Sequence, residues 1–158
     1  MNNGPTLNTG STGTHVKRLQ RILVMRQYLL ASQITGNYDV TTKQRVKDFQ
    51  QDKGLVADGI TGPATWQALP ADPNTPLLAV GSTGTAVSAV QGVLKRISPP
   101  NPNPGAIDGH FGALTKAAVI AYQQEIGVTA DGIIGDKTWW YPAGAAGATL
   151  ASLAGLTT

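Results

Sequence analysis

The sequence predicts an all-α protein made of two consecutive small three-helix bundles. Three observations lead to this prediction: a long internal repeat, apolar spacings of three and four residues, and turn signals that recur at matching places. The repeat is the clearest of the three, because one stretch returns unchanged after 71 positions and another after 73. The pairs are Gly10-Ser11-Thr12-Gly13-Thr14 with Gly81-Ser82-Thr83-Gly84-Thr85, Ala57-Asp58-Gly59-Ile60 with Ala130-Asp131-Gly132-Ile133, and Thr65-Trp66 with Thr138-Trp139.

The repeat sets the predicted domain boundaries. We expect a first repeat at residues 7–70, a Pro-rich linker at 71–76, a second repeat at 77–142 and a low-complexity Ala/Gly tail at 143–158. Each repeat has about 65 residues, which is close to the lower size at which a domain folds alone. Such a unit buries one modest core and has little surface for a deep active site. The prolines make the linker semi-rigid.

Each copy opens with a predicted amphipathic helix, because apolar residues recur at spacings of three and four. We expect the first of these helices to run from Thr14 to Leu29. Its partner stops at a cluster of prolines, which cannot continue a helix. The apolar positions are Val16, Leu19, Ile22 and Leu23, then Val87, Val90, Leu94 and Ile97; the prolines are Pro99, Pro100, Pro102 and Pro104.

A second helix is expected to begin near Thr41, with Asp39 or Thr41 as its cap. Gly54 and Gly127 stand where the end of this helix needs a positive φ angle. The residues expected to face the core are Val46 and Phe49 in the first copy and Val119, Tyr122 and Ile126 in the second.

A short third helix is expected to begin at Gly62-Pro63, since proline suits the first helical position, and at Gly135-Asp136 in the second copy. It carries Trp66 and Leu69 inward in the first copy. Residues 149–156 of the tail are expected to form a weak helix. The side chains expected to dock it are Leu150, Leu153 and Leu156.

Charge is unevenly shared between the two copies. The whole chain carries a formal +3, with a net +4 between Leu7 and Pro70, zero between Pro76 and Pro142, and Asp72 in between. A basic first copy could favour a polyanion, or its charges could simply form a solvated helix face. With no cysteine, disulfides and thiolate metal sites are excluded. No 18-residue apolar run or signal peptide is visible, so the export route is left open.

The motifs of common enzyme classes are missing from the sequence. The two histidines, His15 and His110, fall at non-equivalent positions of the two copies, and no His-Glu-x-x-His zinc motif exists. No Gly-x-Ser-x-Gly elbow and no phosphate-binding loop followed by Lys are found. A glycosidase would need two carboxylates positioned in one cleft, yet the repeated acid, Asp58 and Asp131, is alone in its turn. We therefore predict a protein that is not an enzyme and holds no cofactor and no metal.

Taken in order, these pieces resemble the peptidoglycan-binding domain found on many bacterial wall hydrolases and phage lysins. The pattern is Gly-x-x-Gly-x-x-Val, an aromatic residue, a Thr-headed helix ending in an aromatic-Gln pair, then Gly, Asp-Gly, Gly and Thr-Trp. The first copy departs from it where Thr35 and Asp39 stand in place of Asp and Gly, which concerns the shape of its first loop. The second copy is the fuller match, with Asp108-Gly109-His110-Phe111-Gly112, Thr115, Tyr122-Gln123-Gln124, Gly127, Asp131-Gly132, Gly135 and Thr138-Trp139.

The resemblance covers about residues 7 to 142 and implies a three-helix domain that holds wall glycopeptide in a shallow groove. Such domains usually deliver an attached enzyme to its substrate. The chain would then be a non-catalytic wall-binding protein or targeting module in the cell wall or outside the cell. Its partners would be the glycan or stem peptide of peptidoglycan and a wall hydrolase.

Aromatic residues are the first candidates for ligand contact. Tyr38 and Phe111 could stack on a sugar ring, or each could close a helix start as a hydrophobic staple. Trp66 and Trp139 could also contact a ligand, although a bundle this small needs large side chains in its core.

Polar residues of the turns and helix starts are the second candidates. Asp58 and Asp131 could accept a hydrogen bond from a sugar amide or pair with an ammonium of the stem peptide, or each could bond its own turn. The free N–H groups at Thr41-Thr42 and at Leu114-Thr115 could hold a stem-peptide carboxylate, or the threonines could cap their helices.

Two linked sites would bind more tightly than either alone through effective concentration. Competing interpretations are a protein–protein adaptor or phage or cell-envelope structural component, a minor hydrolase with an unrecognised site, and, least favoured, a nucleic-acid binder.

Overall fold

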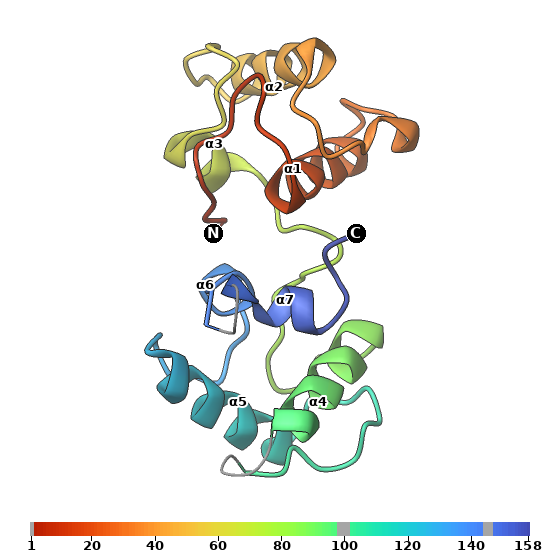
Figure 1. The fold of residues 1–158 in the computed structure, drawn as a ribbon, viewed down its shortest axis with the longest axis vertical. Coiled ribbons are helices and arrows are strands. Elements are labelled where there is room, and N and C mark those ends of the chain that lie inside the picture. Colours follow the sequence, from red (N-terminus) through yellow and green to blue (C-terminus); the bar gives the residue numbers. More distant parts are fainter. Residues whose placement is uncertain (1, 98–101, 144–146) are drawn as a thin grey trace. The chain divides into compact units, whose positions relative to one another are not determined.

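A computed structural model describes residues 2–97, 102–143 and 147–158, and it divides the chain into two compact units. Unit 1 comprises Met1–Pro73 with Thr157–Thr158, and unit 2 comprises Asn74–Leu156. Figure 1 shows each unit as a small cluster of helices joined by loops, and no strand occurs in the described ranges. The all-α prediction is confirmed. Pro99 and Pro100, which were expected to stop a helix, lie outside the described residues.

Unit 1 contains α1 (Thr14–Met25), a single 3-10 turn η1 (Ala31–Gln33), α2 (Val40–Asp52) and α3 (Pro63–Ala68). The predicted helix start at Thr14 is correct, but the predicted end at Leu29 is wrong. Gln27 takes a φ of 66°, a left-handed conformation that ends a helix. The Tyr28 N–H then bonds back to the Leu23 carbonyl at 2.8 Å, and this turn brings Leu29 into the core.

The second and third helices begin at the expected residues. Asp39 is the cap of α2, since its carboxylate accepts a 2.8 Å hydrogen bond from the Thr42 N–H. Thr41, the alternative cap, is exposed. Pro63 occupies the first position of α3, as predicted. Gly54, after α2, has a φ of 68°.

Unit 2 contains α4 (Thr85–Ile97), α5 (Ala113–Ile126), α6 (Asp136–Trp139) and α7 (Leu150–Leu153). Gly127 ends α5 with a φ of 81°, as the sequence indicated. The tail helix exists but is shorter than expected, and Thr149 caps it. Leu150 is fully buried, whereas Leu153 is 40% exposed, so the expectation that Leu153 docks the tail is wrong. A four-residue helix presents only one buried face, and Leu153 lies off it.

Each unit has its own hydrophobic core, and in each core a tryptophan occupies the same position. Trp66 is 1% exposed and Trp139 is fully buried. The Trp66 indole N–H donates to the Pro5 carbonyl, and the Trp139 indole N–H donates to the Pro76 carbonyl, both at 2.8 Å. The expected core residues Val46, Phe49, Val119 and Tyr122 are buried and Ile126 is half-buried.

Each compact unit extends beyond the repeated sequence. In unit 1, Gly4 lies so close to Trp66 that a Cβ there would approach its Cε2 to 2.5 Å. In unit 2, α7 packs against α4 and α6. The α4 positions equivalent to Arg18 and Arg21 of α1 are the small residues Ala89 and Gly92. The two units therefore complete similar cores with different segments of chain.

Candidate ligand grooves

A buried glutamine organises the loop between α2 and α3. Gln50 is 1% exposed, and its Oε1 accepts a 2.9 Å hydrogen bond from the Gly59 N–H. Its Nε2 donates to Asp58 Oδ1 at 3.0 Å, to the Ile60 carbonyl at 2.9 Å and to Thr65 Oγ1 at 3.0 Å. One side chain thus ties α2, the loop and α3 together, and without it the Gly59 N–H would lose its hydrogen-bond partner.

The same network occurs four times in the described chain, twice in each unit. In each case the glutamine Oε1 accepts from a glycine N–H at 2.9–3.0 Å, and Nε2 donates to a threonine Oγ1 at 3.0–3.1 Å. Each unit is therefore built from two related halves. The four sets are Gln20–Gly36–Thr42, Gln50–Gly59–Thr65, Gln91–Gly109–Thr115 and Gln123–Gly132–Thr138.

The first loop of unit 1 keeps this geometry although its sequence departs from the pattern. Thr35 Oγ1 accepts from the Asn37 N–H at 3.2 Å and from Gln20 Nε2 at 3.4 Å. Asp108 Oδ1 makes the equivalent bonds in unit 2 at 2.9 and 3.1 Å. Asp39 replaces Gly112 without strain, because both have an ordinary negative φ, −93° and −102°. The loop shape is retained with longer hydrogen bonds.

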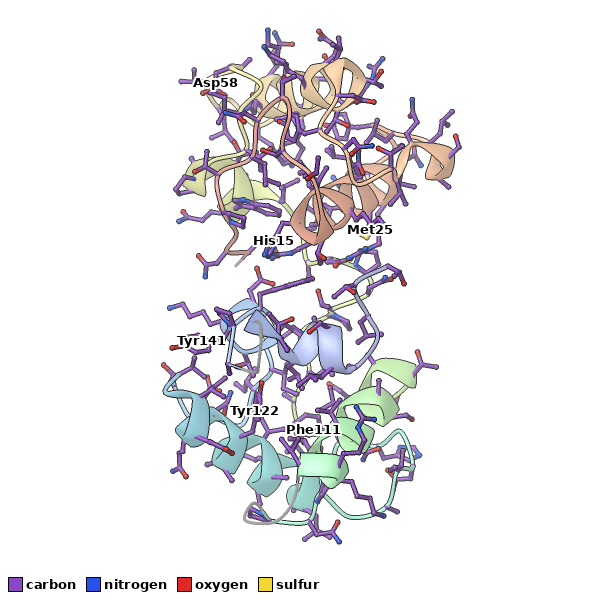
Figure 2. All side chains as sticks on the ribbon, in the orientation of Figure 1. His15, Met25, Asp58, Phe111, Tyr122 and Tyr141 are labelled. Atoms are coloured by element: carbon purple, nitrogen blue, oxygen red, sulfur yellow. The ribbon has the colours of Figure 1, made fainter. Side chains whose placement is uncertain are left out.

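A groove of about 390 Å³ lies beside the Gln50 network in unit 1. Val56 is 80% exposed and Ile60 is 39% exposed, so apolar surface faces solvent at this groove. Asp58 supplies its negative charge, and Figure 2 shows Asp58 on the loop at the surface of unit 1. The residues that define the groove are Gln50, Val56, Asp58, Ile60, Pro63 and Thr65.

A second groove, of about 210 Å³, lies beside the Gln91 network in unit 2. Leu114, which is 63% exposed, gives this groove its apolar surface. The two grooves are equivalent through the half-repeat and not through the 73-residue repeat. The corresponding residues are Gln50 and Gln91, Asp58 and Asp108, Ile60 and His110, and Thr65 and Thr115.

The aspartates of both grooves are held with one oxygen inward. Asp58 Oδ1 accepts from the Ile60 N–H at 2.9 Å, and this bond, followed by the one from Gln50, lowers the pKa of Asp58 from 3.8. The His110 N–H, followed by Gln91, lowers the pKa of Asp108 in the same way. Neither Oδ2 receives a hydrogen bond within the described ranges. Each groove therefore presents an ionised carboxylate oxygen next to apolar surface.

The structure places most of the predicted ligand aromatics in the cores. Tyr38 and Phe111 are each 2% exposed, so neither presents a ring face to solvent. Figure 2 shows Phe111 inside unit 2. Tyr38 donates to the Gly59 carbonyl at 2.7 Å, and burial raises the pKa of its hydroxyl to about 12. Trp66 and Trp139 are core residues, which favours the structural interpretation over ligand contact.

Among the predicted polar site residues, two threonines are buried, whereas Thr41 and the two aspartates are exposed. Thr42 and Thr115 are 1% and 2% exposed, and their hydroxyls accept from Gln20 and Gln91, so they belong to the internal networks and do not cap their helices. Thr41 is exposed at the start of α2. Asp58 and Asp131 bond their own turns, as the alternative interpretation held, and both stay exposed.

Asp108 is a groove residue that was not among the predicted site residues. The signal was present in the sequence, because Asp-Gly-x-x-Gly-x-x-Thr occurs at 58–65, 108–115 and 131–138. The longer repeat pairs Asp58 with Asp131. The half-repeat pairs Asp58 with Asp108.

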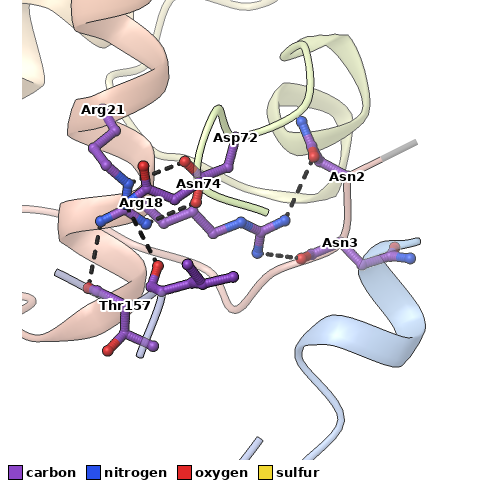
Figure 3. Close-up of polar contacts among 8 residues, drawn as sticks. Asn2, Asn3, Arg18, Arg21, Asp72, Asn74 and Thr157 are labelled. Carbon is purple, nitrogen blue, oxygen red and sulfur yellow. Dashed lines mark hydrogen bonds and ion pairs between the residues drawn. The ribbon is translucent and has the colours of Figure 1, made fainter. Parts of the chain in front are cut away.

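Two arginines of α1 have structural roles in unit 1. Figure 3 shows Arg21 paired with Asp72 and Arg18 extending toward Asn2 and Asn3. The Arg21–Asp72 pair is bidentate, at 3.0 and 2.7 Å, with the Asp72 side chain fully buried. The Arg18 guanidinium lies 4.6 Å from the centre of a Trp66 ring. These cations belong to the framework of the unit, not to a ligand surface.

Comparison with known proteins settles the family. The family model described as a putative peptidoglycan binding domain matches residues 12–69 and again 83–139. The chain belongs to this family. The two matches fall on unit 1 and unit 2, so both units are putative peptidoglycan binding domains, as the sequence pattern indicated.

Three curated relatives are wall enzymes by name. A probable N-acetylmuramoyl-L-alanine amidase of Bacillus licheniformis is 36% identical over 85% of this chain and 44% of its own length. The N-acetylmuramoyl-L-alanine amidase CwlM of Mycobacterium tuberculosis is 37% identical over 64% of this chain and 26% of its own. The zinc D-Ala-D-Ala carboxypeptidase of Streptomyces albus G is 44% identical over 40% and 26%. The chain thus spans less than half the length of these relatives.

Two solved structures are similar in sequence to part of the chain. A Clostridioides difficile peptidoglycan-binding protein in complex with glutamine hydroxamate is 36% identical, with a TM-score of 0.36 over 42% of this chain and 39% of that one. The Burkholderia AP3 phage endolysin is 27% identical, with a TM-score of 0.39 over 77% and 38%.

The described residues offer neither a metal-binding cluster nor a membrane-spanning helix. They contain no group of three or more His, Cys, Asp or Glu side chains placed to hold a metal ion. None of their helices has the length and hydropathy needed to cross a membrane.

Proposed function

We propose that the chain is a non-catalytic cell-wall protein or targeting module that binds peptidoglycan through two weak sites, one groove in each unit. Membership of the family supports wall binding for both units. The observation that supports the sites is the pair of equivalent grooves, each with an ionised aspartate oxygen beside exposed apolar surface.

The chemistry of the grooves fits a muropeptide. An aspartate oxygen accepts from an N-acetyl amide, a peptide N–H or the ammonium of a diamino acid in the stem peptide. The exposed Val56 and Ile60 in unit 1, and Leu114 in unit 2, offer contact area for methyl groups such as those of alanine. Both grooves are small and open, so each contact is expected to be weak.

Two weak sites on one chain give avidity. The two units follow each other directly in the chain at Pro73 and Asn74, and sites connected by so short a path have an effective concentration on the order of millimolar. Either unit alone should therefore bind far more weakly than the pair. We propose that the protein locates to the wall and brings a wall hydrolase to its substrate, because the relatives that share this region are named amidases.

Sedimentation with purified sacculi tests the proposal. The sacculi should first be stripped of anionic polymers, so that only peptidoglycan is offered. Asp58→Asn and Asp108→Asn keep an Oδ1 that accepts the loop bonds but replace the outward oxygen with an N–H donor. Each single variant is expected to bind about fivefold more weakly, and the double variant to lose binding.

Asp48→Asn is the matched control, because it removes one negative charge from unit 1 at a residue outside the groove. It should bind like the unmodified protein. Complete recovery of the unmodified protein in the supernatant at low salt would refute the proposal. Retention on a protein bait without retention on sacculi would instead support an adaptor.

A further inference from the structure

We infer that unit 1 carries an anion-binding site, formed by Lys43 and Lys47 of α2 over the Asp58-Gly59 loop, that contacts a phosphodiester-linked polymer of the cell wall. The inference goes beyond groove binding. It relies on the proposed location at the wall only for the choice of polymer, and its ligand is different from peptidoglycan itself.

The two lysines converge on one point of the loop. A Cβ built on Gly59 would meet Lys43 Cγ at 2.7 Å, Lys43 Cε at 3.1 Å and Lys47 Cε at 3.3 Å. Gly59 has a φ of 74°, and its lack of a side chain leaves room for both lysine stems. Because both Cε atoms lie within 3.3 Å of this one point, the two side chains pack on the same part of the loop and have less freedom to lose on binding.

Asp58 attracts Lys47 electrostatically, but no carboxylate pairs directly with either lysine in the described part of the chain. Within the described ranges, neither makes a hydrogen bond or an ion pair. They stand four residues apart on one helix face, where like charges destabilise a helix slightly. A bound anion would relieve this repulsion.

Each acid of unit 1 has closer partners than these two lysines. They are Asp39 with the Thr42 N–H, Asp48 with Arg45, Asp52 with the Tyr28 hydroxyl, Asp58 with Gln50 and the Ile60 N–H, and Asp72 with Arg21. Eight Lys and Arg residues against five Asp residues leave unit 1 at +3, whereas four of each leave unit 2 at zero. The charge is concentrated on the unit that holds the lysine pair.

Unit 2 provides a natural comparison. Its Gly132 has the same conformation, with a φ of 73°, and lies under Lys116 and Ile120 in place of Lys43 and Lys47. Ile120 Cγ1 lies 3.3 Å from the Cβ position, the same distance as Lys47 Cε in unit 1. The fold therefore accepts an apolar residue at position 47, so packing does not require the second lysine.

A polymer of repeated phosphodiesters suits this site better than a single anion. Two exposed ammonium groups are screened by salt and bind one phosphate only weakly. A chain of phosphates can occupy both lysines at once and rebind along its length. Such binding should weaken as salt rises, because counterions are released from the polymer.

Binding of the full chain to soluble poly(glycerol phosphate) tests the inference by calorimetry at low salt and near 0.15 M. The double variant Lys43→Gln with Lys47→Ile is expected to lose about tenfold in affinity at low salt. The control Arg26→Gln with Lys53→Gln removes the same net charge from exposed positions of unit 1 and should change affinity less than about twofold. Equal losses in both variants, or no polymer binding, would overturn the inference.

Further binding experiments distinguish the lysine site from the groove, and a wall polymer from a nucleic acid. Asp58→Asn should strengthen polymer binding slightly, because Asp58 lies near Lys47, while it weakens binding to polymer-free sacculi. The lysine variant should bind those sacculi like the unmodified protein, and a loss there would mean that the lysines serve the groove. Equally tight binding to duplex DNA of matched charge would reject a wall polymer as the partner.

Discussion

Nε2 of Gln50 donates a 3.0 Å hydrogen bond to Oδ1 of Asp58, and the same amide holds the Gly59 N–H. This contact joins the framework of unit 1 to its candidate groove. A glutamine that is 1% exposed orders the loop, and the loop in turn leaves one aspartate oxygen outward. The same relationship between Gln91 and Asp108 orders the groove of unit 2.

Gln50→Leu should destabilise unit 1 by about 2–3 kcal/mol, because the Gly59 N–H loses its partner inside the protein and the three hydrogen bonds donated by Gln50 Nε2 are lost. Denaturant unfolding followed by circular dichroism measures the change. The neighbour Gln51 is exposed, so Gln51→Leu should alter stability by less than about 0.5 kcal/mol. Similar effects of the two substitutions would show that the network does not order the loop.

Asp72→Ala should destabilise unit 1 by about 3 kcal/mol, since it leaves the buried Arg21 guanidinium without its counter-charge. The comparison is Asp48→Ala, which breaks the partly exposed Arg45–Asp48 pair and should cost less than about 1 kcal/mol. Thermal unfolding of both variants gives the ranking, and an equal cost would contradict the structural role of Asp72.

Leu150→Ala should destabilise unit 2 by about 2–4 kcal/mol, because Leu150 is fully buried in its core. Leu153→Ala, on the exposed side of the same short helix, should cost less than about 1 kcal/mol. Calorimetric melting of the two variants tests whether α7 is part of unit 2. A neutral Leu150→Ala would show that the tail does not complete this core.

Acid should weaken the fold through three aspartates. Hydrogen bonds from backbone N–H groups lower the pKa of Asp39, Asp58 and Asp108 below 3.8, so the folded state favours their ionised forms. Their contribution to stability is complete above about pH 4 and is lost as the pH falls through the lowered values. The melting temperature should therefore drop below that pH.

Asp39→Asn isolates one of these aspartates. Asparagine caps a helix as well as aspartate does, so α2 should keep its stability at neutral pH. The melting temperature of the Asp39→Asn variant should then fall less on acidification than that of the unmodified protein. An unchanged acid response would mean that the cap bond from the Thr42 N–H does not contribute.

The sequence predicts the helix starts well, because Asp39 and Pro63 are local signals read without tertiary context. It places the end of α1 wrongly, because Gln27 adopts its left-handed turn without a glycine or proline to mark it. Leu29 fits the helical spacing, yet it reaches the core from the loop. The end of α1 is set by tertiary packing, which the apolar spacing does not reveal.

The candidate site was harder to predict than the fold. The sequence leaves the aromatic residues open as ligand contacts or as structural residues, and a unit of this size uses Tyr38 and Trp66 for its core. The sequence does not predict the structural role of the four network glutamines, because a buried amide carries no charge and does not alter the apolar spacing. Pairing residues by the half-repeat would have placed Asp108 beside Asp58 in the list of candidates.

Sedimentation of the full chain with polymer-free peptidoglycan sacculi tests the central claim most directly. The account predicts that the protein pellets with the sacculi and that Asp58→Asn combined with Asp108→Asn leaves it in solution. Undiminished pelleting of the double variant would contradict the proposed grooves, and no pelleting of the unmodified protein would contradict wall binding itself.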